Sequence, residues 1–287
     1  MYNQIIDTGS TSCGYLYIAI GKRYVLEAEI SARSLRRFTK YPVCLITDDT
    51  SYSNALFDKI IIAQSPGDFI AKIIGMNLTP FERTVYLDND TFVCSDVDEL
   101  FSILDFFEMS MLPFPFQHSY SFFAQYNPTY KLKYERVIPE YHLGVVAYKT
   151  TGTVKKLLAD WLAMHEEMHI KSDASSFREV YFNYVRDVRI APLPFEYNYH
   201  GTHSFGFAYN EIKIIHERLG EKWNTLTTVM LPYEKMEKKA NAFNKYKGKR
   251  IIIPYFGVLP YRFSPYRIKY VIKRMLGIKK TKKAETF

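Results

Sequence analysis

The feature that most constrains this chain is an apolar segment that ends in two acids. Residues 85–87 have the composition of a short buried strand, Asp88 and Asp90 follow at its carboxyl end, and residues 91–93 resume the apolar pattern. Charges are costly to bury unless they are paired or bind a metal. Ligands of open α/β sheets lie just beyond the carboxyl ends of strands, and two carboxylates there suit Mg²⁺ or Mn²⁺ carrying a diphosphate. The alternative interpretation is an Asp-Asn-Asp turn between two strands.

The segments around this strand alternate between strand and helix patterns. The predicted strands are 15–20, 41–47, 59–63, 85–87, 109–116, 143–148 and 212–216. The predicted helices are 25–38, 68–78, 153–168 and 173–185, the last capped by Asp173. This order is typical of an α/β fold with a mainly parallel sheet flanked by helices.

Length and composition indicate a globular protein. The chain has 287 residues, 47% of them hydrophobic, which suffices for one large domain or two small ones. Its three cysteines are too few for a disulfide framework or a zinc site and favour a reducing compartment. There is no signal-peptide pattern and no apolar run of about 18 residues, so we expect a cytoplasmic protein.

The positive charge is concentrated at the carboxyl end. Residues 259–287 contain nine basic residues and one acid, so their net charge of +8 equals that of the whole chain. We therefore expect a domain at 1–258 and a basic tail at 259–287. The tail has apolar residues at helical spacing, which predicts a basic amphipathic helix and peripheral contact with an anionic membrane surface. Docking of that helix on the domain is an equal alternative, and nucleic-acid binding is not expected because no binding module accompanies the tail.

The acidic motif resembles a known signature. Residues 86–91, Tyr-Leu-Asp-Asn-Asp-Thr, resemble the Asp-x-Asp motif of GT-A-fold glycosyltransferases. The order of further motifs over roughly residues 15–223 is similar to family eight, which includes glycogenin and bacterial lipopolysaccharide galactosyl- and glucosyltransferases. Residues 215–223, Ile-His-Glu-Arg-Leu-Gly-Glu-Lys-Trp, resemble the family's His-x-x-Gly-x-x-Lys-Pro-Trp box. The resemblance implies a GT-A (Rossmann-like) fold and a metal held by Asp88, Asp90 and His216.

Other motifs are assigned to the donor by the same resemblance. Lys72 stands where the family has a basic residue that contacts the sugar nucleotide, and Lys222 where a lysine meets the diphosphate. Tyr24, after the first strand, is a candidate to stack on a uracil ring. The predicted donor-binding residues are Tyr24, Lys72, Asn89, Gly144, Gly220 and Lys222.

Three residues are candidates for the catalytic centre. Asp173 stands where the family has an Asp-Gln pair, and His142 at the Asn of the family's Asn-x-Gly-Val segment. Glu140 is the candidate base should the reaction invert configuration, although the resemblance implies retention. The implied reaction moves a sugar from a nucleoside-diphosphate sugar, a UDP-sugar first of all, to a glycan, lipid-linked or protein acceptor. The metal would stabilise the leaving diphosphate, and the imidazole ligand favours Mn²⁺ over Mg²⁺.

The chain also departs from the family pattern. Gly21 and Arg23 replace an Asp and an Asn after the first strand, with Asp48 or Asp49 as candidate substitutes, and Ala174 replaces the Gln after Asp173. Donor specificity therefore does not transfer. The alternatives are a catalytically degenerate sugar-nucleotide or carbohydrate-binding protein, a nucleotidyltransferase with a short basic loop at 21–23, and self-glycosylation on a tyrosine.

Overall fold

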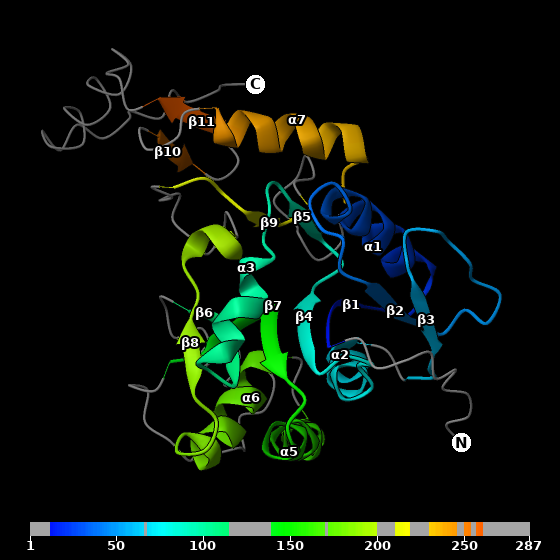
Figure 1. Ribbon diagram of the computed structural model, residues 1–287, viewed down its shortest axis with the longest axis vertical. Coiled ribbons are helices and arrows are strands. Elements are labelled where there is room, and N and C mark those ends of the chain that lie inside the picture. Colours follow the sequence, from blue (N-terminus) through cyan, green and yellow to red (C-terminus); the bar gives the residue numbers. More distant parts are fainter. Residues whose placement is uncertain are drawn as a thin grey trace, which may run out of the picture.

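The computed structural model describes residues 12–65, 68–114, 139–169, 172–199, 210–218 and 230–245, and the backbone of 250–253 and 257–260. A seven-stranded sheet in the order β3-β2-β1-β4-β7-β6-β8 lies at its centre (Figure 1). Within this sheet β7 alone runs antiparallel to its neighbours, so the predicted mainly parallel α/β fold is confirmed. The strands are β1 (Cys13–Ala19), β2 (Val43–Thr47), β3 (Lys59–Ile62), β4 (Arg83–Leu87), β6 (Met109–Pro113), β7 (Tyr141–Lys149) and β8 (Ile190–Pro192).

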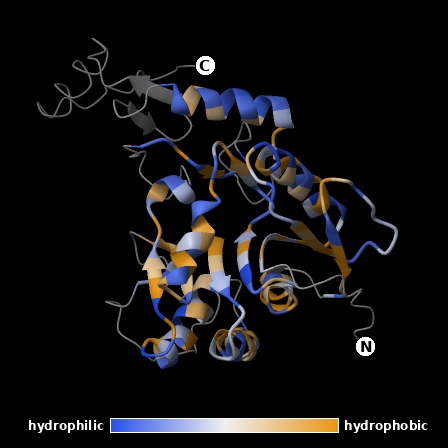
Figure 2. Ribbon diagram, viewed as in Figure 1, coloured by the Kyte–Doolittle hydropathy of each residue, from blue (hydrophilic) through white to orange (hydrophobic). Residues whose placement is uncertain are grey.

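Helices cover both faces of the sheet. Leu16 and Ile18 of β1 pack on the face covered by α2, α5 and α6, whereas Tyr15 and Tyr17 pack on the face covered by α1 and α3. Because both faces are buried, the central strands are mainly apolar, as the orange of β2 in Figure 2 shows. The helices are α1 (Lys22–Leu35), α2 (Asp68–Asn77), α3 (Glu99–Ser102), α5 (Gly152–Met168), α6 (Asp173–Tyr181) and α7 (Tyr233–Asn244).

A second, two-stranded sheet carries part of the acidic motif. β5 (Thr91–Val93) pairs antiparallel with β9 (Ile214–His216), and Thr91 lies opposite His216. Phe92 and Ile215 of this small sheet pack against α7, which Figure 1 shows above it. The register of this sheet brings His216 beside the end of β4, although more than 120 residues separate them in sequence.

Several boundaries differ from the sequence expectations. The helix predicted at 25–38 spans 22–35, and the strand predicted at 212–216 begins at Ile214. Ser172, not Asp173, occupies the N-cap of α6, so Asp173 is the first helical residue. Another two-stranded sheet joins β10 (Arg250–Ile253) and β11 (Gly257–Pro260). Residues 261–287 of the basic tail lie outside the described residues. None of the helices described is both long and apolar enough to cross a membrane.

Candidate metal centre and adjoining cavity

The two aspartates lie in a turn that backbone hydrogen bonds hold in place. β4 ends at Leu87, and the amide of Asp88 donates to the carbonyl oxygen of Gly144 on β7 at 2.8 Å. The carbonyl of Asp88 then accepts from the amide and the hydroxyl of Thr91, at 3.1 Å and 2.8 Å. The turn between β4 and β5 is therefore fixed at both ends, and it presents Asp88 and Asp90 on one side.

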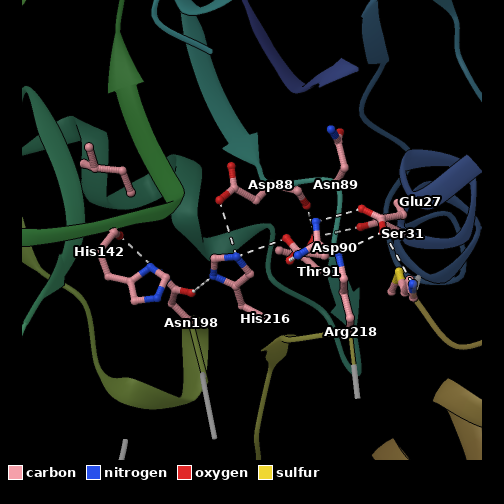
Figure 3. Close-up of polar contacts among 12 residues, drawn as sticks. Glu27, Ser31, Asp88, Asn89, Asp90, Thr91, His142, Asn198, His216 and Arg218 are labelled. Atoms are coloured by element: carbon pink, nitrogen blue, oxygen red, sulfur yellow. Dashed lines mark hydrogen bonds and ion pairs between the residues drawn. The ribbon is translucent and has the colours of Figure 1, made fainter. Parts of the chain in front are cut away.

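His216 completes a compact set of ligand atoms. Its Nε2 lies 3.3 Å from Asp88 Oδ2 and 3.2 Å from Asp90 Oδ1, and the three ligand atoms lie within 4.8 Å of one another. Figure 3 shows the imidazole between the two carboxylates. Ligands bound at right angles with bonds of about 2.1 Å are separated by roughly 3 Å. Two carboxylate oxygens and one imidazole nitrogen at this spacing fit a single divalent ion.

Electrostatics show that this set favours positive charge between the two carboxylates. Burial alone would lower the pKa of His216, but Asp90 and Asp88 outweigh it and raise that pKa to about 9. Burial alone would raise the pKa of Asp90, but His216 and Arg218 lower it to about 2. The pKa of Asp88 lies well below its usual range, because Lys72 and His216 outweigh its burial. A proton on His216 thus supplies the charge that a metal would otherwise supply.

Lys72 and Asp173, both predicted site residues, meet next to the metal ligands. The Nζ of Lys72 lies 3.0 Å from Asp88 Oδ1 and 2.7 Å from Asp173 Oδ2. Burial alone would lower the pKa of Lys72, but the two carboxylates outweigh it and raise that pKa well above its usual value. Asp173 also accepts a hydrogen bond from the amide of Ala174 at 2.9 Å. One buried ammonium group therefore joins a metal ligand to the candidate catalytic carboxylate.

A cavity of about 250 Å³ opens beside the metal ligands. Predicted donor residues Tyr24, Lys72 and Asn89 line it, and so do the cations Arg23 and Arg218. Asn89 donates from Nδ2 to the carbonyl of Ile18 at 2.8 Å, while its buried Oδ1 has no hydrogen-bond partner in the described parts of the chain. The complete lining is Ile18, Ile20, Arg23, Tyr24, Phe69, Ala71, Lys72, Tyr86, Asp88, Asn89, Asp90, His216 and Arg218.

Glu140 and His142 lie behind the metal ligands and not in the lining of this cavity. Glu140 is 2% exposed and accepts from the hydroxyl of Ser175 at 2.8 Å. The ring of His142 packs edge-on against His216, with 4.7 Å between ring centroids. Their catalytic roles stay predictions.

Gly144 touches the metal site directly, whereas two other predicted residues cannot be placed. A Cβ atom at Gly144 would lie 2.0 Å from Cε1 of His216, so only glycine allows the ring its observed position. Gly220 and Lys222 lie outside the described residues.

The candidate substitutes for base recognition have other contacts. Asp48 accepts from the amide of Gly21 at 2.8 Å, and Gly21 has φ 92°, a conformation that favours glycine. Asp49 accepts from the amide and the hydroxyl of Ser51, at 2.9 Å and 2.7 Å. Neither aspartate is in the lining of the described cavity, and a role in base recognition stays a prediction.

Arg218 is a site residue that was not predicted from the sequence. Its Nη1 lies 2.9 Å from Asp90 Oδ2, and its Nε and Nη2 contact the two carboxylate oxygens of Glu27 at 2.9 Å and 3.0 Å. Glu27 is 1% exposed. The available signal was an arginine two residues after His216 in a recognised motif, combined with a glutamate on the buried face of a helix.

Asn198 was also missed. Its Oδ1 lies 2.9 Å from Nδ1 of His216, on the side of the ring opposite the two aspartates (Figure 3). No sequence pattern indicated this contact, because it arises from a bridge between Tyr199 and Ile215.

Comparisons with known proteins find similar solved structures but no matching family model or curated protein. Among solved structures, the crystal structure of mouse xyloside xylosyltransferase 1 in its apo form is similar with a TM-score of 0.48 and 14% identity. The likeness covers 75% of this chain and 99% of the other.

Proposed function

We propose that this protein is a metal-dependent glycosyltransferase that uses a nucleoside-diphosphate sugar, a UDP-sugar first of all. The acceptor would be a glycan, a lipid-linked sugar or a protein, and the anomeric configuration would be retained. One observation carries the proposal. Asp88, Asp90 and His216 form a compact ligand set at the carboxyl end of a buried strand, next to a cavity lined by basic side chains.

The charges around the cavity support a metal and a diphosphate together. With a neutral His216, the carboxylates of Glu27, Asp88, Asp90 and Asp173 and the cations Arg23, Lys72 and Arg218 leave one net negative charge. A divalent ion reverses that sign, and the site then attracts an anionic diphosphate. When bound, Mn²⁺ or Mg²⁺ would supply Lewis-acid stabilisation of the leaving group.

The side chains of the chain have separate tasks in this proposal. Asp88, Asp90 and His216 hold the ion, and Arg218 stabilises negative charge at the cavity wall. Lys72 holds the Asp173 carboxylate in place, so that Asp173 can bind hydroxyls of the donor sugar near the reacting carbon. Tyr24 offers an aromatic face, 38% exposed, on which the base can stack.

The nucleotidyltransferase alternative is disfavoured by the first turn. A phosphate-binding loop needs free backbone amides. The amide of Gly21 already donates to Asp48, so the short basic loop at 21–23 lacks that donor. The replacement of a family Gln by Ala174 favours the other alternative, a catalytically degenerate binding protein. The assay described next distinguishes that protein from an active glycosyltransferase.

The test is a donor screen on the full chain. A ligand that binds only the folded state stabilises it and so raises the melting temperature. At a ligand concentration of a hundred times Kd, the gain in the free energy of unfolding is about 2.7 kcal/mol. We expect a shift with one UDP-sugar that requires Mn²⁺ and is lost in Asp90→Asn and His216→Gln. Asp105→Asn, on a half-exposed aspartate paired with Arg83, serves as the control.

Three outcomes of the screen are informative. A shift followed by Mn²⁺-dependent donor hydrolysis, with a retained configuration in the product, supports the proposal. A shift without hydrolysis or transfer favours the degenerate binding protein. Folded protein that gives no shift with any donor or with Mn²⁺ contradicts the metal site itself.

The location of the protein is a separate proposal. We propose peripheral contact of residues 259–287 with the cytoplasmic face of an anionic membrane, which would bring the domain to a lipid-linked acceptor. Co-sedimentation of the full chain with phosphatidylserine vesicles, but not with phosphatidylcholine vesicles, is the expected result, and high salt should abolish it.

A further inference from the structure

We infer that Asn198 is a positioning residue that fixes the tautomer and ring orientation of His216, so that Nε2 faces the metal. The inference rests on the proposed function, because it takes His216 to be a metal ligand. Asn198 is fully buried, and its side chain lies between two histidine rings, His142 and His216.

The orientation of the Asn198 amide follows from a neighbour that can only accept. One terminal atom of the amide lies 3.2 Å from the carbonyl oxygen of His142. A carbonyl oxygen has no hydrogen to donate, so this atom must be the NH₂ group, Nδ2. The same NH₂ group lies 3.2 Å from Nδ1 of His142, which can accept its second hydrogen. The other terminal atom is therefore Oδ1.

The tautomer of His216 follows from that orientation. Asn198 Oδ1 lies 2.9 Å from Nδ1 of His216, and an amide oxygen can only accept a hydrogen bond. Nδ1 of His216 must therefore carry the hydrogen. In the neutral ring the lone pair is then on Nε2, which lies 3.3 Å and 3.2 Å from the two aspartates. Asn198 thus selects the form of the ring that can bind a metal between them.

The ring is also held in position by contacts that do not involve hydrogen bonds. Gly144 lies so close that a Cβ atom there would be 2.2 Å from Nδ1 of His216. The edge-on contact with His142 limits rotation on the other side. With packing fixing the position of the ring, the hydrogen bond to Asn198 decides which nitrogen carries the hydrogen.

The backbone fixes Asn198 to the strand that carries His216. The amide of Tyr199 donates to the carbonyl of Ile214 at 2.9 Å, and the amide of His216 donates to the carbonyl of Tyr199 at 2.8 Å. These two bonds hold Asn198 next to the strand that carries His216. Partners of this kind typically contribute 10- to 100-fold in metal affinity.

The experiment measures Mn²⁺ affinity by calorimetry in two variants at Asn198. Asn198→Leu has nearly the same shape but no acceptor, and we expect Mn²⁺ to bind 10- to 100-fold more weakly. Asn198→Asp loses the NH₂ group but keeps an acceptor for Nδ1–H, and its carboxylate makes the His216 ring more basic, so we expect Mn²⁺ to bind at least as tightly as in wild type. Unchanged affinity in the folded Leu variant would overturn the inference.

The matched control is Asn244→Leu. The Asn244 side chain also holds the chain near β9, through hydrogen bonds with the amide and the carbonyl of Ile212, both at 2.9 Å. It makes no contact with a metal ligand. Its substitution should lower stability while leaving Mn²⁺ affinity unchanged, and a loss equal to that of Asn198→Leu would assign the effect to general loosening of β9.

A spectroscopic measurement decides the inference even where a variant fails to fold. In wild-type protein with ¹⁵N-labelled histidine and bound Zn²⁺, the His216 spectrum should show hydrogen on Nδ1 and none on Nε2. The opposite assignment would overturn the inference. If the protein binds no divalent ion, the proposed function fails, and the same spectrum of metal-free protein at pH 10 still decides the tautomer.

Discussion

Metal binding should depend on pH in a way that the cluster around His216 determines. In the metal-free protein, Asp88 and Asp90 raise the pKa of His216 to about 9. A ligating imidazole must be neutral, so Nε2 of His216 has to lose its proton when Mn²⁺ binds. We therefore expect the apparent affinity for Mn²⁺ to increase steeply between pH 6.5 and pH 8.5.

The magnitude follows from this pKa. At pH 7 about one molecule in a hundred has a neutral His216, so the apparent Kd is about a hundredfold weaker than at high pH. Each pH unit in this window should improve the Kd about tenfold, or about 1.4 kcal/mol. An ordinary histidine, with a pKa near 6.5, would give almost no change above pH 7.5.

Calorimetry at pH 7 and pH 8, in buffers with different ionisation enthalpies, measures both quantities. We expect close to one proton released for each Mn²⁺ bound, and a tenfold difference in Kd between the two pH values. His216→Gln removes the titrating group, so its weaker binding should be independent of pH. A wild-type Kd that stays constant from pH 7 to pH 8, with no proton released, would refute the coupling of the imidazole to the two carboxylates.

Three further measurements test the environment of the site. Without metal, protonated His216 stabilises the fold below about pH 6.5, and this contribution is lost as pH rises to about 9. The free energy of unfolding, measured in urea, should therefore fall by about 3 kcal/mol across that window, and His216→Gln should abolish the decrease. Gly144→Ala should lower the free energy of unfolding by about 1–3 kcal/mol and weaken Mn²⁺ binding at least about tenfold, because the new methyl group displaces the His216 ring. A Cβ atom at Gly152 would meet no described atom within 4 Å, so Gly152→Ala should change neither quantity, and equal effects of the two substitutions would contradict the packing argument. Arg218→Gln should destabilise the protein by about 1.5–3 kcal/mol in the same urea assay, because it removes the closer of the two arginines that pair with the buried Glu27 and leaves Arg23 at 3.5 Å. The double substitution with Glu27→Gln should restore part of the loss, and simple addition of the two losses would argue against the pair.

Local sequence determined the layers of this fold and the acidic end of its central strand. Hydrophobic periodicity predicts the central strands and the flanking helices, because a residue's periodic position decides whether it faces the core. The apolar run before Asp88 and Asp90 likewise places two carboxylates at the edge of a buried sheet. Helix ends were less accurate, as at α1, because Gly21 and not an apolar residue decides where that helix begins.

Tertiary structure alone decided which distant groups complete the site. The pairing of β5 with β9 places His216 beside the aspartates, and the bridge between Tyr199 and Ile215 places Asn198 behind its ring. Lys72 of α2 contacts Asp173 of α6, 101 residues away. Periodicity describes only which face of an element is buried. Which charged groups meet depends on strand order and register, and these are set by packing of the whole sheet.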